Sequence, residues 1–134
     1  MLRYKNADPD IEDYMDTDAL AKAYAIMTVG NGQHSFIWHN QRFYYNPVTS
    51  KLEPIVFDCF ADAGEIIEKP PKVFGNRKPG THSYNPNHYS LLSPFNNKEF
   101  KQLYISYVNK FSNNKYISDF FLSKSAALDS LTKI

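Results

Sequence analysis

The polar residues from Gln33 to Arg42, followed by Asp58, are the part of this sequence best suited to chemistry. The run contains His34 and Asn40, and Asp58 comes after a second stretch of strand-forming residues. A helix, a hairpin and a closing carboxylate in this order can present an amide oxygen and a carboxylate side by side. A metal ion held against phosphate needs hard oxygen ligands of these kinds. Protein kinases use such a layout, with an Asn and a later Asp as metal ligands.

The elements around this cluster follow from apolar spacing and turn residues. A helix is predicted over residues 19–29, capped by Asp16 or Thr17 and ended by the Gly-Asn-Gly run at 30–32. Aromatic and β-branched residues predict a strand over residues 35–45, a turn at 46–50 and a return strand over 52–57. Because Pro54 has no N–H to donate, the return strand should lie at an edge or begin after it.

The second half of the chain is predicted to be mainly helical. A short helix at 61–68 precedes a proline-rich basic loop at 69–94. Asn96 and Glu99 form an Asx version of the capping box for a helix that ends near Phe111. Two further helices are predicted at 116–122 and 126–131. The expected fold is one α+β domain over residues 1–134, mostly helical with one small sheet, after an irregular acidic lead-in at 1–16.

Composition narrows the classes of partner. Hydrophobic residues make up 43% of the 134 residues, which predicts a folded chain. The net charge of +1 indicates no general attraction to nucleic acid or membrane. No apolar stretch approaches the roughly 20 residues of a membrane span, and the first residues contain no signal-peptide core. Cys59 is the sole cysteine, so an intramolecular disulfide is excluded, and we expect its side chain to be buried.

Residues 38–58 also resemble a known family. A His39-Asn40 pair, a tyrosine-rich strand, a Pro-x-Thr turn from Pro47 to Thr49 and a closing Asp58 occur in the order seen in the CotH family of atypical protein kinases, which is named for a spore coat protein. The residues from Asn96 to Tyr107 are similar to the helix that follows in that family. The match is strong at 38–58 and looser over the rest of 17–134.

The resemblance implies the C-terminal lobe of a kinase-like fold that binds ATP with Mg²⁺ or Mn²⁺ and phosphorylates proteins on serine. It implies Asn40 and Asp58 as the metal ligands, and Asn40 and Arg42 as contacts to the nucleotide. It also implies a protein substrate or an envelope or coat protein as partner, and a place outside the cytoplasm, in the spore coat or cell envelope.

Three departures from the family leave the chemistry open. The family has a second Asp after the closing one, whereas Asp58 is followed by Cys59. His34-Ser35 stands where the family has its catalytic Asp, so His34 is the candidate base, with Asp58 as the second catalytic residue. Residues 1–16 cannot supply an amino-terminal lobe with a glycine-rich loop. The chain is therefore interpreted as a fragment of a larger kinase domain, inactive alone. The alternative is a non-catalytic protein-interaction module that kept the fold. Zinc held by His34 and His39, and a triad of Ser35, His34 and Asp58, are weaker alternatives.

Overall fold

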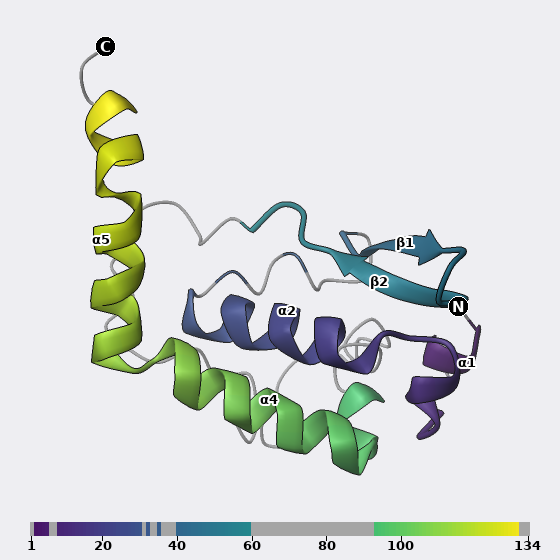
Figure 1. Ribbon diagram of the computed structural model, residues 1–134. Coiled ribbons are helices and arrows are strands. Elements are labelled where there is room, and N and C mark those ends of the chain that lie inside the picture. The colour runs from purple at the N-terminus through teal and green to yellow at the C-terminus, as the bar shows by residue number, and fades with distance from the viewer. Residues whose placement is uncertain are drawn as a thin grey trace, which may run out of the picture.

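The computed structural model describes residues 2–5, 8–30, 32, 35, 40–59 and 93–131 (Figure 1). In chain order the elements are α1 (Leu2–Lys5), the 3₁₀ helix η1 (Ile11–Asp13), α2 (Thr17–Val29), β1 (Arg42–Asn46), β2 (Lys51–Ile55), the 3₁₀ helix η5 (Ser93–Asn96), α4 (Lys98–Phe111) and α5 (Asn114–Leu131). The two strands form one antiparallel sheet. The predicted class, mostly helical α+β with one small sheet, is confirmed at this level.

Helix α2 begins two residues before its predicted start. The Asp16 side chain accepts a hydrogen bond from the backbone N–H of Ala19 (2.9 Å), so Asp16 is the cap. The helix ends where predicted, at Gly30, whose N–H donates to the carbonyl of Ile26 (2.8 Å). Local hydrogen bonds at both ends set these bounds, which is why the sequence pattern located them well.

Helix α4 is capped by a different asparagine from the one predicted. Asn97 is the cap, since its Oδ1 accepts from the N–H of Phe100 (2.9 Å) and its backbone is extended. Asn96 instead closes the 3₁₀ helix η5. The prediction of Asn96 as the cap was therefore wrong by one residue.

Helix α5 is continuous from Asn114 to Leu131, so the prediction of two helices in this region was wrong. The serines at the expected break do not interrupt it. The hydroxyls of Ser123 and Ser125 donate to the carbonyls of Phe120 and Leu122, within the helix itself. In Figure 1 this helix continues from the end of α4 and stands away from the hairpin.

The core lies between α2 and α4 and is largely aromatic. Tyr24 of α2 meets Phe95 and Phe100 edge to face, with ring centroids 5.9 and 5.3 Å apart. Tyr104 lies next to Phe95 at 5.0 Å and also contacts α2 through the hydroxyl of Thr28 (3.1 Å). Such edge-to-face pairs add to the free energy gained by burying the rings.

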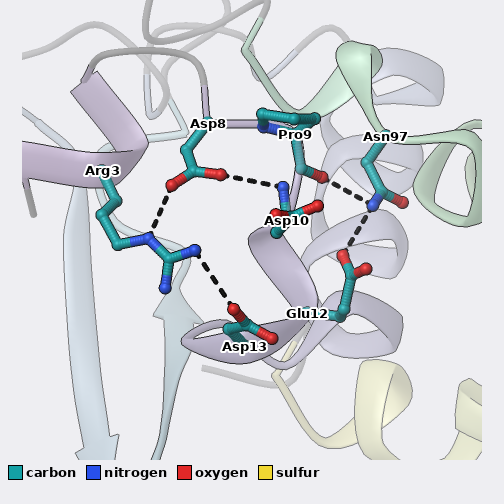
Figure 2. Close-up of polar contacts among 7 residues, drawn as sticks. All are labelled: Arg3, Asp8, Pro9, Asp10, Glu12, Asp13 and Asn97. Atoms are coloured by element: carbon teal, nitrogen blue, oxygen red, sulfur yellow. Dashed lines mark hydrogen bonds and ion pairs between the residues drawn. The ribbon is translucent and has the colours of Figure 1, made fainter.

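The amino-terminal segment is not the irregular lead-in that was predicted. It contains α1 and η1, and Tyr4, Ile11 and Met15 are fully buried. Polar contacts join this segment to itself and to α4 (Figure 2). Among these, Asn97 donates to the carbonyl of Pro9 (2.8 Å) and to Glu12 (2.6 Å). The acidic pattern at 1–16 therefore belongs to a packed segment.

Arg3 accounts for part of this acidic pattern. Its guanidinium bonds to the carboxylates of Asp8 (2.6 Å) and Asp13 (3.1 Å) (Figure 2). The Asp8 carboxylate also accepts from the N–H of Asp10 (3.0 Å). Both contacts hold the pKa of Asp8 below its ordinary value, that with Arg3 more strongly. Part of the acidic pattern at 1–16 thus belongs to an internal ion-pair network.

The hairpin is shorter than predicted. Arg42 pairs with Ile55 and Asn46 with Lys51, so β2 ends before Phe57 and β1 begins well after residue 35. The turn lies at residues 47–50, where the Asn46 side chain accepts from the N–H of Val48 (2.9 Å).

Pro54 lies within β2, opposite Phe43, in a two-stranded sheet in which both strands are edges. The outer edge of β2 is partly covered. Leu52 donates its N–H to the carbonyl of Tyr14 and accepts from the N–H of Asp16, both at 2.9 Å. These two bonds tie the hairpin to the start of α2.

The predicted helix at 61–68 and nearly all of the loop at 69–94 lie outside the described residues. Among the helices that the structure describes, none has the length and apolar character needed to cross a membrane.

Candidate metal site at the hairpin

Asn40 and Asp58 lie side by side at the open end of the hairpin. The Nδ2 of Asn40 donates to the Oδ2 of Asp58 over 3.1 Å. Asn40 precedes β1 by two residues and Asp58 follows β2 by three, so the antiparallel pairing of Arg42 with Ile55 brings them together. Asn40 is 7% exposed, whereas Asp58 faces solvent. The structure thus joins the two residues that the sequence analysis named as metal ligands.

Asp58 has a left-handed backbone conformation, with φ of 54°. Aspartate and asparagine enter this region more readily than other residues with a side chain, because their short polar groups bond locally. The conformation turns the chain as it leaves β2 and aims the carboxylate back toward Asn40. This turn was not predicted, since the sequence pattern treated Asp58 simply as the end of a strand.

Gly32 approaches this turn closely from the loop after α2. A Cβ atom at Gly32 would lie 3.4 Å from the Cβ of Cys59 and 2.8 Å from the sulfur of Met27. The distance to Cys59 is an ordinary van der Waals contact, and the closer atom belongs to the flexible Met27 side chain, so Gly32 lies near Cys59 without being required there. Cys59 itself is exposed, so the expectation of a buried thiol was wrong. It lies on the irregular segment that follows β2.

Arg42 was expected to contact nucleotide, which stays a prediction, and its side chain contacts two neighbours within the hairpin region. Its guanidinium carbon lies 5.5 Å from the centre of the Phe57 ring, and its Nη1 donates to the carbonyl of Gln41 (3.0 Å). Phe57 is 53% exposed. Sequence reasoning treated this Phe only as part of a strand, although its place next to Asp58 was a usable signal.

Two of the other predicted residues cannot be placed at the site. His34, the candidate base, and His39, its partner in the alternative zinc site, lie outside the described residues. Ser35 is buried and its hydroxyl donates to the carbonyl of Gly32 (3.1 Å). A serine nucleophile needs an accessible hydroxyl bonded to a base, so this geometry does not favour a triad through Ser35. Within the described part of the chain, no group of three or more His, Cys, Asp or Glu side chains is placed to hold a metal.

The donor set at the hairpin nevertheless suits one kind of metal ion. Mg²⁺ is usually held by one or two protein side chains, with waters and substrate phosphates completing its shell. The carboxylate of Asp58 and the amide oxygen of Asn40 are hard donors of this type. In this contact Asn40 presents its Nδ2 to Asp58. Metal binding would therefore require the Asn40 amide to give up this hydrogen bond and to present its oxygen to the ion instead.

A buried polar pair lies behind the hairpin. The hydroxyls of Tyr4 and Tyr24 are 2.9 Å apart, and burial raises the pKa of both well above its ordinary value. Both phenols therefore stay neutral at physiological pH. The ring of Tyr4 meets Phe43 of β1 edge to face at 5.7 Å, which fixes the inner face of the hairpin to the core.

No family model, no curated protein and no solved structure matches this chain. The resemblance to the CotH family therefore rests on the sequence motif, and it stays a prediction.

Proposed function

We propose that this chain is the C-terminal, lobe-like part of a CotH-like kinase domain, in which Asn40 and Asp58 hold Mg²⁺ or Mn²⁺ against the phosphates of ATP. One observation carries the proposal. The two residues that match the family's metal ligands are 18 positions apart, and the hairpin brings their side chains to 3.1 Å. The mostly helical fold with one small sheet is compatible with such a lobe.

The two side chains would have different tasks. Asp58 supplies the negative charge that makes cation binding favourable, and Asn40 supplies a neutral oxygen from a nearly buried position. A cation bound here would neutralise charge on phosphate oxygens during transfer to a protein serine. His34 would be the base that accepts the proton of that serine hydroxyl. The protein substrate, the envelope or coat partner and the extracytoplasmic location belong to the same proposal and rest on the resemblance.

Metal binding can be tested without activity. Mn²⁺ broadens NMR signals of nearby nuclei even when it binds weakly, so MnCl₂ titrated into the ¹⁵N-labelled full chain should broaden the Asn40 side-chain amide and the Cys59 backbone amide first. Addition of ATP should strengthen the effect, because phosphate oxygens complete the coordination shell. Asp58→Asn should abolish selective broadening while keeping the left-handed turn, since Asn tolerates it.

Asp119→Asn is the matched control. Asp119 is an exposed carboxylate that pairs with Lys115 (2.6 Å) in α5, a helix that stands away from the hairpin (Figure 1). This variant should bind Mn²⁺ as the unmodified chain does. Broadening that is equal at Asp58 and Asp119, or that persists in Asp58→Asn, would show that the hairpin pair is not a metal site.

The second candidate function, a non-catalytic interaction module, is favoured by α5. Within this helix Ile117, Phe120 and Phe121 share one face, at spacings of three and four residues, and are 36%, 49% and 57% exposed. Apolar side chains gathered on an exposed surface are typical of protein-binding surfaces. Phosphate transfer by a longer protein that contains this chain decides between the two candidates. Transfer that is lost in Asp58→Ala and retained in Asp119→Asn would exclude a purely non-catalytic role.

A further inference from the structure

We propose that Arg42 is a positioning residue for Asp58, and that it acts by stacking on Phe57 rather than by binding nucleotide. The inference rests on the proposed metal site, whose geometry it explains. The guanidinium of Arg42 lies 5.5 Å from the centre of the Phe57 ring, and Phe57 immediately precedes Asp58.

The location of this contact makes it effective. Regular pairing of the strands ends at Arg42 and Ile55, so strand hydrogen bonds no longer hold residues 56–58. Asn40 and Asp58 both lie beyond that point, and their 3.1 Å contact needs the two departing segments to remain together. Arg42 on one segment and Phe57 on the other form a bridge between the last strand pair and the site.

The Arg42 side chain is suited to this task. Its guanidinium is planar, so it can lie over an aromatic face while its N–H groups bond elsewhere. Nη1 does so, because it donates to the carbonyl of Gln41 (3.0 Å). Gln41 follows Asn40 directly, so the same guanidinium contacts the neighbours of both proposed metal ligands.

The residue on the other side of Asp58 lies near the loop after α2. A Cβ atom built on Gly32 would be in ordinary van der Waals contact with the Cβ of Cys59, at 3.4 Å. Asp58 therefore stands between Phe57, which lies under Arg42, and Cys59, which lies near Gly32, and it has a left-handed conformation with φ of 54°.

The test is a double-mutant cycle on the full chain, with MnCl₂ as the probe. Arg42→Lys keeps the charge but loses the planar group, and Phe57→Leu keeps an apolar side chain but loses the ring. Each should weaken Mn²⁺ binding about two- to fivefold, the equivalent of one exposed cation–π contact. The double variant should be no weaker than either single variant, because both changes remove the same contact.

Two further variants separate positioning from general stability. Phe57→Tyr keeps the ring and should bind Mn²⁺ as the unmodified chain does. Lys22→Gln removes another cation–π pair, in which Nζ of Lys22 in α2 lies 5.2 Å from the centre of the Tyr107 ring in α4. This variant should leave Mn²⁺ binding unchanged. All variants should retain the thermal midpoint of the unmodified chain within a few degrees.

The Asn40 side-chain amide signals distinguish failure of this inference from failure of the proposed function. If the unmodified chain binds Mn²⁺ and neither Arg42→Lys nor Phe57→Leu weakens binding, Arg42 does not position Asp58, although the metal site stands. If no Mn²⁺ binds but both variants shift the Asn40 amide signals without added metal, the positioning role holds and the metal function is lost. Additive losses in the double variant would overturn the shared contact.

Discussion

The helical layer, formed by α2, η5 and α4, differs from the hairpin in how far its side chains are buried. In the layer, Phe100 is fully buried and Tyr24 is 2% exposed. On the hairpin, Tyr44 and Tyr45 are more than half exposed, and Val48 in the turn is 91% exposed. The layer is therefore stabilised mainly by burial of rings, whereas the hairpin depends on strand hydrogen bonds and on one inner face, where Phe43 and Leu52 pack against the core.

This difference separates stability from the candidate site. Asn40 and Asp58 lie at the end of the hairpin, away from the buried rings of the helical layer. Changes at these two residues should therefore alter chemistry without unfolding the chain. The amino-terminal segment joins the two regions, since Tyr14 and Asp16 bond to Leu52 of β2 while Glu12 bonds to Asn97 at the start of α4. We infer that the amino-terminal segment couples unfolding of the hairpin to unfolding of the helical layer.

The comparison predicts its largest effect at Phe100. Phe100→Ala should lower the free energy of unfolding by about 3–5 kcal/mol, because it removes a fully buried ring between Tyr24 and Tyr104. Urea unfolding followed by circular dichroism measures the change. Phe121→Ala is the matched control, since that ring is 57% exposed and its loss should cost less than about 1 kcal/mol. Equal losses for the two variants would contradict the assignment of the core.

A smaller effect is expected at the cap of α4. Asn97→Ala should cost about 1–2 kcal/mol, because it removes the cap to Phe100 and also the bonds to Pro9 and Glu12. The same urea experiment measures it. Asn96→Ala is the control, because the capping-box pattern predicted Asn96 as the cap. It should lower the free energy of unfolding by less than Asn97→Ala does. If Asn96→Ala is the more damaging change, the cap lies where the capping-box pattern placed it.

At Asp58, the stability of a variant should depend more on whether the new residue tolerates a positive φ than on whether the charge is kept. Asp58→Ala should destabilise by about 1 kcal/mol, since alanine disfavours a φ of 54°. Asp58→Asn should be close to neutral, because asparagine tolerates this conformation. Thermal unfolding of both variants gives the comparison. If the two midpoints agree, the left-handed turn contributes nothing measurable to stability.

The smallest predicted effect is on the acid side of the stability profile. The Tyr107 hydroxyl donates to Asp18 (2.6 Å) and, with a lesser contribution from Lys22, lowers the pKa of that carboxyl. A folded-state pKa below the unfolded value stabilises the fold above about pH 4, and that contribution is lost as pH falls through the folded-state pKa.

Tyr107→Phe should therefore reduce the fall in unfolding free energy between pH 5 and pH 2, by about a few tenths of a kcal/mol because Asp18 is exposed. Urea unfolding at several pH values measures it. Tyr44→Phe, on the exposed face of the hairpin, is the control and should leave the acid slope unchanged. A steeper acid slope in Tyr107→Phe would reverse the sign of the argument.

Local patterns predicted the parts of the fold that local bonds create. The start of α2 at Asp16 and its end at Gly30 depend on hydrogen bonds that span three or four residues, so the sequence showed both. The hairpin turn after Asn46 is local in the same sense. The proximity of Asn40 and Asp58 was also predictable, because an antiparallel hairpin brings its two ends together.

Two of the features that sequence patterns missed depend on contacts between distant segments. Asn97, rather than Asn96, caps α4, and it also bonds to Glu12, 85 residues earlier in the chain. The acidic segment folds because Tyr4, Ile11 and Met15 reach the core, which no periodicity over so few residues indicates.

The sequence by itself therefore determined the mostly helical class, the hairpin and the pair of residues at its open end. Only the tertiary structure showed that Asp58 has a left-handed conformation and that Arg42 lies over the neighbouring Phe57 ring. The physical reason is range: caps and turns are satisfied within a few residues, whereas the conformation of an exposed carboxylate is set by whatever the fold places on both sides of it.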